Sequence, residues 1–212
     1  MGKSFLIREG QDIVLRRVFK KEKIGFYVDV GAHHPKRFFN TYFFYRMGWS
    51  GINIDAMPGS MKKFKKYRRR DINLELGVAK QEGILNYYVF NEPALNTFSV
   101  SLAERRKLSE NNYYIKKIIK VKVTPLHEIF ACHLNGQKID FLNVDVEGFD
   151  LNVLESNDWS KYRPRFVLAE ILEGSLHNID QDKVVQFMKE QGYAVYAKQI
   201  NTVVFKDLIA NH

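Results

Sequence analysis

The stretch FYVDVGAHHP, residues 26–35, decides the fold class of this chain. Its first five residues form a short apolar run rich in aromatic and β-branched side chains, which predicts a buried strand. Gly31 follows at once and predicts a turn, because glycine adopts backbone conformations that other residues avoid. A buried strand that runs into a glycine turn and then a helix is typical of an open α/β sheet, in which ligands bind beyond the strand ends.

The same alternation of apolar runs and amphipathic stretches continues on both sides of this segment. Further strands are predicted at 51–55, 72–79, 82–90, 119–123, 139–146, 166–171, 194–197 and 202–205. Helices are predicted at 11–19, 38–47, 61–70, 125–134, 149–156 and 180–192. Continuous apolar strands that alternate with helices predict a mostly parallel sheet covered by helices on both faces.

Two short connections add detail to this prediction. The strands at 72–79 and 82–90 are close enough in sequence to pair as a hairpin through Gln81–Gly83. The last two strands are joined by Lys198–Asn201 alone, and so short a link cannot hold a helical crossover. The final pair is therefore predicted to be antiparallel, at the end of an otherwise parallel sheet.

Composition sets the broad class of the protein. Its 212 residues, 45% hydrophobic and 14% aromatic, can bury a core and exclude wholesale disorder. The single cysteine, Cys132, excludes an internal disulfide framework. The sequence shows no signal-peptide core and no run of about eighteen apolar residues, so we expect a soluble, cytoplasmic protein. We expect one domain over 1–212 with a short helical extension over about 1–23, and the sequence carries no signal for its oligomeric state.

Positive charge is concentrated in one segment. Lysine and arginine number 33 against 24 aspartate and glutamate residues, which gives a formal net charge of +9. Much of the excess lies in Lys62–Arg70, where Met61, Phe64 and Tyr67 recur at helical spacing and predict one buried stripe. This basic run is either a solvated helix face or a weak attraction for an anionic partner, such as a phosphate-bearing substrate, a nucleic acid or a membrane surface.

Acidic residues stand at the ends of four predicted strands. They are Asp29, Asp55, Asp145 with Glu147, and Glu170. Because the carboxyl ends of parallel strands meet at one edge of a sheet, we expect these side chains to converge. Clustered carboxylates repel one another, so the pattern indicates a binding or catalytic site rather than a requirement of folding.

The turn after the first strand argues against a dinucleotide ligand. Nicotinamide- and flavin-binding sheets carry G-x-G-x-x-G at this place, whereas Asp29–His34 holds a single glycine. Asp55 lies 26 positions after Asp29, close to the separation of about 20 at which a carboxylate binds ribose hydroxyls. The pair fits an adenosine ligand that lacks a pyrophosphate, and we expect the turn amides to bind a carboxylate or a phosphate.

Several motifs resemble those of the FkbM-type methyltransferases. They are YVDVGAHHP, NTYFFY, GWSGINIDAMP, DINLELGVAKQEG, FLNVDVEGFDLNVLES and RPRFVLAEI, which occur in the family's order over about 11–205. The resemblance implies a class I methyltransferase, with a Rossmann-like fold and a seven-stranded sheet. It also implies S-adenosylmethionine as methyl donor and O-methylation of a small-molecule hydroxyl, and we expect a sugar or glycan acceptor.

The resemblance assigns cofactor roles at the first strand ends. It implies that Asp29, Gly31 and Ala32 hold the amino-acid end of S-adenosylmethionine and that Asp55 binds its ribose. The stretch Gly77–Val78 would lie near adenine, although its glycine departs from the residue that the family more often has there.

The resemblance also places Asp145 and Glu147 beside the methyl group and the acceptor, with Asp145 among the cofactor contacts. Methyl transfer to a hydroxyl needs the acceptor oxygen about 3 Å from the methyl carbon and the removal of its proton. Glu147 is the first candidate for the base, and His33 is the second. Alternatively, Asp145, Glu147 and Glu170 bind a divalent cation that acidifies the hydroxyl.

Candidate acceptor-binding residues come from three segments. His33 lies in the turn, and two other stretches, Asn40–Thr41 and Asn96–Ser99, match segments shared within the family. We therefore count His33, Asn40, Thr41 and Ser99 as candidate substrate contacts. A helix cap or a structural loop explains each of them at least as well.

Two other functions stay open at this point. The net charge allows an RNA methyltransferase, but its support is a single weak aromatic and basic cluster, Tyr113–Lys117, so we do not expect nucleic acid as a partner. A non-catalytic, cofactor-binding relic of the fold is the second alternative, and the acids at all four strand ends argue against it. We expect a small-molecule or glycan acceptor.

Overall fold

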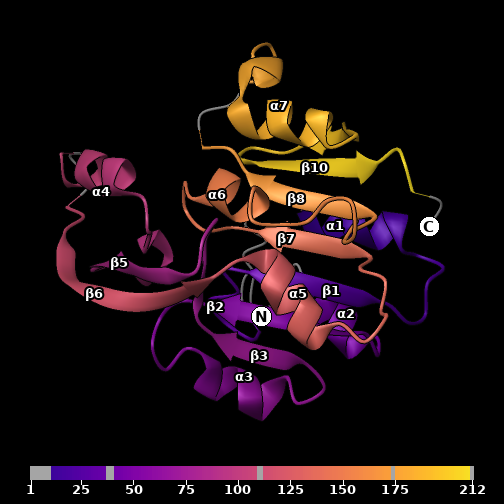
Figure 1. The fold of residues 1–212 in the computed structure, drawn as a ribbon, viewed down its shortest axis with the longest axis horizontal. Coiled ribbons are helices and arrows are strands. Elements are labelled where there is room, and N and C mark those ends of the chain that lie inside the picture. Colours follow the sequence, from indigo (N-terminus) through magenta and orange to yellow (C-terminus); the bar gives the residue numbers. More distant parts are fainter. Residues whose placement is uncertain (1–10, 37–40, 109–111, 173–174, 211–212) are drawn as a thin grey trace, which may run out of the picture.

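The computed structural model describes residues 11–36, 41–108, 112–172 and 175–210. Its main element is a seven-stranded sheet with the order β3-β2-β1-β7-β8-β10-β9 (Figure 1). The strands are β1 (Phe26–Val30), β2 (Ser50–Asp55), β3 (Ile72–Glu75), β7 (Phe141–Val144), β8 (Phe166–Glu170), β9 (Tyr193–Lys198) and β10 (Thr202–Asp207). Neighbouring strands from β3 to β8 are parallel, and β10 runs antiparallel to both β8 and β9. The prediction of a mostly parallel sheet with an antiparallel C-terminal strand is confirmed.

Helices cover both faces of this sheet. They are α1 (Gln11–Val18), α2 (Tyr42–Arg46), α3 (Met61–Tyr67), α5 (Leu126–His133), α6 (Asp150–Leu154) and α7 (Lys183–Glu190). The core on one face takes its helical side chains from α5, α6 and α7, and the core on the other takes them from α1 and α2. The helix α3 lies beside β3 at the edge of the sheet (Figure 1). Because both faces are covered, every side chain of β1 is buried, which explains its continuous apolar run.

The face covered by α1 and α2 has an aromatic core. Phe19, Phe44, Trp49 and Phe141 are at most 2% exposed, and their contacting rings have centroids between 4.7 and 6.1 Å apart. Tilted and edge-to-face aromatic pairs contribute about 0.5–1.5 kcal/mol each beyond the burial of their area. This core therefore anchors α1 and α2 to β1 and β7, the two central strands.

A second, three-stranded sheet has the order β4-β6-β5. Its elements are β4 (Gly77–Val78), β5 (Gly83–Phe90) and β6 (Ile115–Thr124), with a 3-10 turn η1 (Pro93–Leu95) and the helix α4 (Val100–Lys107) between β5 and β6. The prediction of one strand at 72–79 is wrong, because the chain leaves the main sheet after β3. The predicted hairpin through Gln81–Gly83 is also wrong, because β5 pairs along its length with β6.

A packing contact holds the short strand β4 in the second sheet. Gly77 pairs with Val123 of β6, and a Cβ atom on Gly77 would lie 2.5 Å from the ring of Phe98. A side chain at this position would push the ring away from the sheet. The glycine therefore serves the packing of the second sheet.

The interpretation of the basic run as one solvated helix face is wrong for Arg68. Met61 and Phe64 are buried as predicted, while Tyr67 is 39% exposed. The helix ends at Tyr67, and Arg68 has a non-helical backbone that turns its side chain into the protein, where it is 1% exposed. Arg70 is tied to the main chain, since its guanidinium donates to the carbonyls of Tyr45 and Trp49.

Two other helices have boundaries that differ from the predicted ones. The helix predicted at 38–47 starts at Tyr42 in the structure, and 38–40 lie outside the described residues. The helix predicted at 180–192 divides into a 3-10 turn, η2 (Ile179–Gln181), and α7, whose N-cap Asp182 accepts from the N–H of Val184 at 2.8 Å. Within the described part of the chain, no helix has the length and apolar character that crossing a membrane requires.

Candidate active site

A pocket opens where the order of the main sheet reverses. The strand β1 lies between β2 and β7, and the chain proceeds from β1 towards β3 on one side and later towards β8 on the other. Ligands of open α/β sheets bind at this kind of switch point, beyond the carboxyl ends of the strands. The hollow there holds about 830 Å³ of space when its open mouth is counted. Asp29, Asp55, Asp145 and Glu147 all line it, so four of the predicted acids do converge.

Gly31 makes the turn at the end of β1. Its φ of +86° lies in the region that favours glycine, and a Cβ atom there would lie 1.9 Å from the carbonyl oxygen of Asp145. The resemblance places Gly31 at the amino-acid end of the cofactor, whereas its closest neighbour in the structure is the backbone after β7. The glycine therefore lets the ends of β1 and β7 approach each other, and the pocket forms above that contact.

The amides of this turn already have partners within the protein. The N–H groups of Gly31 and Ala32 both donate to the carbonyl of Ile54, at 2.9 and 3.0 Å. The next N–H, that of His33, donates to Asp55 Oδ2 at 2.9 Å. The expectation that these amides bind a carboxylate or phosphate is therefore wrong, and the turn offers no cradle of free N–H groups for a pyrophosphate.

Asp55 ends β2 and faces the pocket. It is 8% exposed, and its other oxygen, Oδ1, accepts from the N–H of Met57 at 2.8 Å. Burial raises the pKa of Asp55, and the hydrogen bonds from Met57 and His33 lower it. A carboxylate has about four acceptor positions, so two backbone donors leave room for hydroxyl groups of a ligand.

Asp29 lies one residue before the end of β1 and is held from behind. Its Oδ2 accepts from the hydroxyl of Thr41 at 2.8 Å, and its Oδ1 accepts from the side-chain amide of Asn143 at 2.9 Å. Burial raises the pKa of Asp29, and these two donors lower it. Thr41 was predicted to contact the methyl acceptor. It is only 3% exposed, so the structure gives it the role of positioning Asp29 instead.

The second sheet forms the opposite wall of the pocket. Gly77 and Val78 line it, next to Phe98 of the shared stretch Asn96–Ser99 and to Tyr87, which the sequence did not suggest. Tyr87 is 8% exposed, and burial, then the nearby carboxylate of Asp55, raises its pKa. The phenol is therefore a neutral hydrogen-bonding group between the two sides of the pocket.

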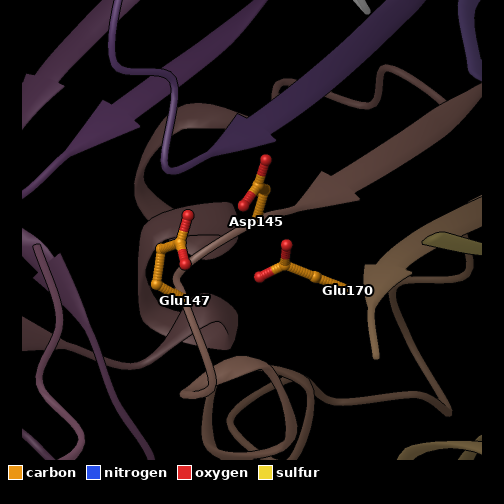
Figure 2. Close-up of side chains that lie close together, drawn as sticks. All are labelled: Asp145, Glu147 and Glu170. Carbon is orange, nitrogen blue, oxygen red and sulfur yellow. The ribbon is translucent and has the colours of Figure 1, made fainter. Parts of the chain in front are cut away.

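Three carboxylates gather where β7 and β8 end. Asp145, Glu147 and Glu170 point toward one another in Figure 2, and each offers an oxygen within 4.8 Å of the others. Glu147 has a φ of +54°, an unusual conformation for a residue with a side chain. The hydroxyl of Thr97 donates to its carbonyl at 2.8 Å, which fixes that backbone. The shared stretch Asn96–Ser99 thus positions Glu147.

Arg106 of α4 is a functional candidate that the sequence did not reveal. Its guanidinium forms an ion pair with Glu147 Oε2 and donates to the carbonyl of Leu95 at 2.7 Å. The two charged side chains are 13% and 10% exposed, so water screens the pair little. The helix α4 is therefore tied to the acidic side of the pocket.

Asp150 is a second residue that was missed. It is 2% exposed, and its Oδ1 accepts from the N–H of Glu170 at 3.1 Å. Its Oδ2 is buried without a hydrogen bond to the part of the chain that the structure describes. Burial, then the carboxylates of Asp145 and Glu147, raises the pKa of Asp150 well above its usual value. A fourth acid therefore lies beneath the other three.

The other predicted acceptor contacts are placed as follows. His33 is exposed and lines the pocket beside Asp55. Ser99 is the N-cap of α4, where its hydroxyl accepts from the N–H of Leu102 at 3.3 Å. Asn40 lies outside the described residues.

Comparison with known proteins bears on the class of this site. Residues 29–195 match the family described as the Methyltransferase FkbM domain, and this range includes every residue that lines the pocket, from Asp29 to Glu147. The comparisons found no matching curated protein and no matching solved structure. Since the match extends over most of the chain, this protein belongs to the FkbM methyltransferase family.

Proposed function

We propose that this methyltransferase uses S-adenosylmethionine to methylate a hydroxyl of a small molecule, and that the acceptor is a sugar or glycan. The observation that carries the proposal is the division of the pocket. Asp29 and Asp55 line it beside β1 and β2, and Asp145 and Glu147 line it beside β7. The first pair suits a ligand with a positive amino group and ribose hydroxyls, and the second pair stands where an acceptor would enter.

The donor set fits S-adenosylmethionine better than a dinucleotide. The N–H groups of Gly31 and Ala32 both donate hydrogen bonds to the carbonyl of Ile54, so few backbone donors are left for a pyrophosphate. The carboxylates of Asp29 and Asp55 accept hydrogen bonds and carry negative charge. They therefore suit an ammonium group and ribose hydroxyls, and they repel a phosphate. Gly77 and Val78 add an apolar wall suited to an adenine ring. When bound, this cofactor supplies an electrophilic methyl group.

Glu147 is proposed as the base that takes the proton of the acceptor hydroxyl. Its carboxylate lines the pocket, and Arg106 contacts Oε2, so Oε1 is the oxygen that we assign to the proton. Thr97 and Arg106 hold both ends of the residue, which limits its motion. An acceptor with several hydroxyls would donate hydrogen bonds to Asp145 and Glu170, since carboxylates accept and do not donate. His33 remains the second candidate for the base.

A divalent cation is the alternative to a general base. Oxygen atoms of Asp145, Glu147 and Glu170 within 4.8 Å of one another form a ligand set that magnesium, manganese or calcium accepts. Such an ion would lower the pKa of a bound hydroxyl. Arg106 competes with it, because a guanidinium already compensates the charge of Glu147.

The test is transfer of labelled methyl from S-adenosylmethionine to a panel of free sugars, nucleotide sugars and glycans, followed by mass spectrometry. The expected product is a methyl ether on one hydroxyl. Parallel reactions with and without chelator decide between the base and the cation. Transfer to RNA with no reaction on the sugar panel would contradict the proposed acceptor class.

A further inference from the structure

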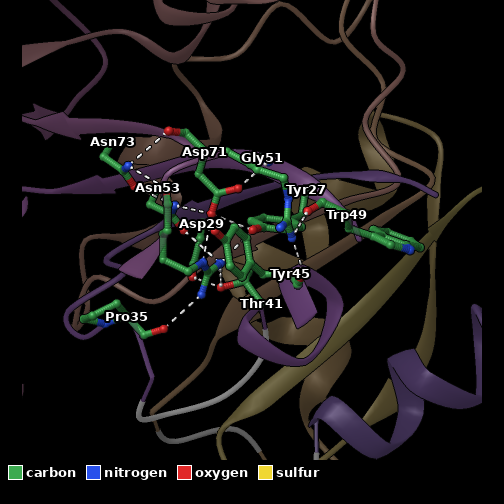
Figure 3. Close-up of polar contacts among 12 residues, drawn as sticks. Tyr27, Asp29, Pro35, Thr41, Tyr45, Trp49, Gly51, Asn53, Asp71 and Asn73 are labelled. Atoms are coloured by element: carbon green, nitrogen blue, oxygen red, sulfur yellow. Dashed lines mark hydrogen bonds and ion pairs between the residues drawn. The ribbon is translucent and has the colours of Figure 1, made fainter. Parts of the chain in front are cut away.

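A buried polar network lies behind Asp29, on the side away from the pocket. Figure 3 shows the contacts among its members, which include Tyr27, Thr41, Asn53 and Asp71. Three neighbouring strands contribute a polar residue at the same level, since Asn53 and Asn143 are the register partners of Asp29 in β2 and β7. Polar groups this deep in a sheet need partners, and the network supplies them.

Arg68 is the positive centre of the network. Its Nε donates to Asp71 Oδ2 at 2.8 Å, and its Nη1 donates to the carbonyl of Pro35 at 3.1 Å. Its Nη2 lies 2.7 Å from the hydroxyl of Tyr27 and 3.0 Å from that of Thr41. The guanidinium is therefore held between an ion pair on one side and two hydroxyls on the other.

The direction of each hydrogen bond follows from the chemistry of arginine. A guanidinium has donors and no acceptor, so the hydroxyls of Tyr27 and Thr41 must accept from it. Each hydroxyl then has its own proton left to donate. Thr41 donates to Asp29 Oδ2 at 2.8 Å, and Tyr27 donates to Asp71 Oδ2 at 2.7 Å. Two parallel chains of hydrogen bonds, or routes, thus lead from Arg68 to a carboxylate: one through Thr41 to Asp29, and one through Tyr27 to Asp71.

Only one of these two routes ends at the pocket. Asp29 lines the pocket, and Asp71 is buried within the network, where it also accepts from the N–H of Gly51. Asn143 donates a hydrogen bond to the second oxygen of Asp29, so both oxygens accept a hydrogen bond from the side away from the pocket. A carboxylate held in this way presents its remaining acceptor positions to the pocket.

We propose that Arg68, acting through the hydroxyl of Thr41, is a positioning residue that keeps Asp29 an ionised acceptor for the amino group of the bound cofactor. The inference rests on the proposed use of S-adenosylmethionine. It adds a role for an arginine of the basic run that touches neither the cofactor nor the acceptor.

The consequence is a pH dependence that the wild-type network suppresses. Burial raises the pKa of Asp29 and Asp71 adds to that effect, whereas Asn143, Thr41 and Arg68 lower it. Removing the Thr41 hydroxyl should therefore raise the pKa of Asp29. At low pH more of Asp29 would be neutral and would lose its attraction for a cationic amino group, and affinity should return as the pH rises.

The test compares three variants by calorimetry with S-adenosylhomocysteine between about pH 6 and pH 9. Thr41→Val removes the hydroxyl and keeps the shape, and Thr41→Ser restores the hydroxyl. Tyr27→Phe is the matched control, because it removes the other hydroxyl on Arg68 without touching Asp29. The ratio of each variant's affinity to that of the wild type cancels the titration of the ligand and of pocket groups such as His33 and Asp55.

The expected loss for Thr41→Val is about tenfold near pH 6, the scale of one hydrogen bond to a charged group, with recovery at higher pH. Thr41→Ser and Tyr27→Phe should follow the wild-type profile. An equal loss at every pH, or the same pH profile in Tyr27→Phe, would overturn the inference. Failure of the wild type itself to bind would instead overturn the proposed function. If valine prevents folding, Thr41→Ala gives the same comparison.

Discussion

On the β1–β2 side of the pocket, Asp29 and Asp55 each accept two hydrogen bonds from the protein, whereas the β7–β8 side crowds carboxylates together. Asp29 is held by Thr41 and Asn143, and Asp55 is held by two backbone N–H groups. On the other side, Asp145, Glu147 and Glu170 approach one another above the buried acid Asp150.

This difference matches the proposed division of the pocket into a side that binds the cofactor and a side that carries out the chemistry. Carboxylates that are already oriented lose little freedom when a ligand binds, so the first side is organised for affinity. On the second side, burial and the carboxylates of Asp145 and Glu147 raise the pKa of Asp150, and crowding of this kind is how active sites tune acids and bases.

The largest effect should come from the crowded side. If Glu147 is the base, Glu147→Gln should lower turnover by about a hundred- to ten-thousandfold, because an amide cannot take the acceptor proton. Affinity for S-adenosylhomocysteine should stay close to wild type, since Asp29 and Asp55 are unchanged. Higher pH should restore part of the rate by ionising more of the acceptor. Steady-state kinetics on an accepted sugar measure the turnover and its pH dependence, and inhibition by S-adenosylhomocysteine in the same assay measures the affinity.

Two controls accompany this variant. Glu147→Gln also breaks the ion pair with Arg106, so the assay must run at a temperature at which the variant is folded by circular dichroism. Glu104→Gln, on the exposed face of α4, alters an ion pair with Lys107 far less shielded from water and should retain full activity. Full activity of Glu147→Gln in chelator would exclude both the base and the cation, and the base would move to His33.

A smaller effect is expected on the recognition side. Asp55→Ala should weaken S-adenosylhomocysteine by about ten- to a hundredfold, since it removes a charge-assisted hydrogen bond to ribose worth about 1.5–3 kcal/mol. Calorimetry measures the change, with Asp180→Ala as a control because that carboxylate is exposed near α7. Unchanged affinity in Asp55→Ala would remove this residue from the cofactor site.

The apolar strands and the acids at their ends could be predicted because both signals are local. Continuous burial leaves a continuous apolar run, and the strand FYVDV of β1 is buried at every position. Asp29, Asp55, Asp145 and Glu147 then meet because parallel strands end at one edge. The same reasoning recovered the antiparallel pair β9 and β10 from the shortness of its link.

The polar network does leave a signal in the sequence. Asn53, Asn73 and Asn143 each interrupt an apolar strand, just as Asp29 does. Together with Asp29 they are register neighbours across four adjacent strands, β3, β2, β1 and β7. A polar residue at the same place in successive buried strands indicates a row of side chains that must satisfy one another.

Other parts of the site could not be read from local pattern. Arg68 stands in a run of similar basic residues, and only the end of α3 at Tyr67 turns it inward. Arg106 reaches Glu147 across 41 positions of sequence, from the helix α4, which is absent from the predicted set. Asp150 lies two residues after Gly148, at the start of α6, where an acidic residue is common, and its burial depends on packing beneath β8. Long-range contacts decide all three.

An effect on folding stability is also expected on the crowded side. The pKa of Asp150 is raised in the folded chain by burial and by its acidic neighbours, so the folded protein loses stability as pH climbs above the unfolded pKa of about 3.9 towards the folded value. Asparagine does not titrate. The gain in unfolding free energy for Asp150→Asn should therefore grow over that interval, by about 1.4 kcal/mol for each rise of one in the pH.

Urea unfolding at a series of pH values measures this gain. Asp158→Asn is the control, because Asp158 is exposed and its hydrogen bonds with Ser160 lower its pKa. That variant should gain nothing as the pH rises. A gain for Asp150→Asn that does not change with pH would show that the pKa of Asp150 is not raised in the folded protein.

The most direct test of the central claim, that this pocket binds S-adenosylmethionine, is thermal unfolding with S-adenosylhomocysteine or NADH. At a hundred times the dissociation constant, binding adds about 2.7 kcal/mol of stability, which corresponds to a rise in melting temperature of roughly 5–10 °C for a chain of this size. We expect that rise with S-adenosylhomocysteine and none with NADH, because the turn after β1 has no donors left for a pyrophosphate. A rise with NADH and none with S-adenosylhomocysteine would contradict the claim.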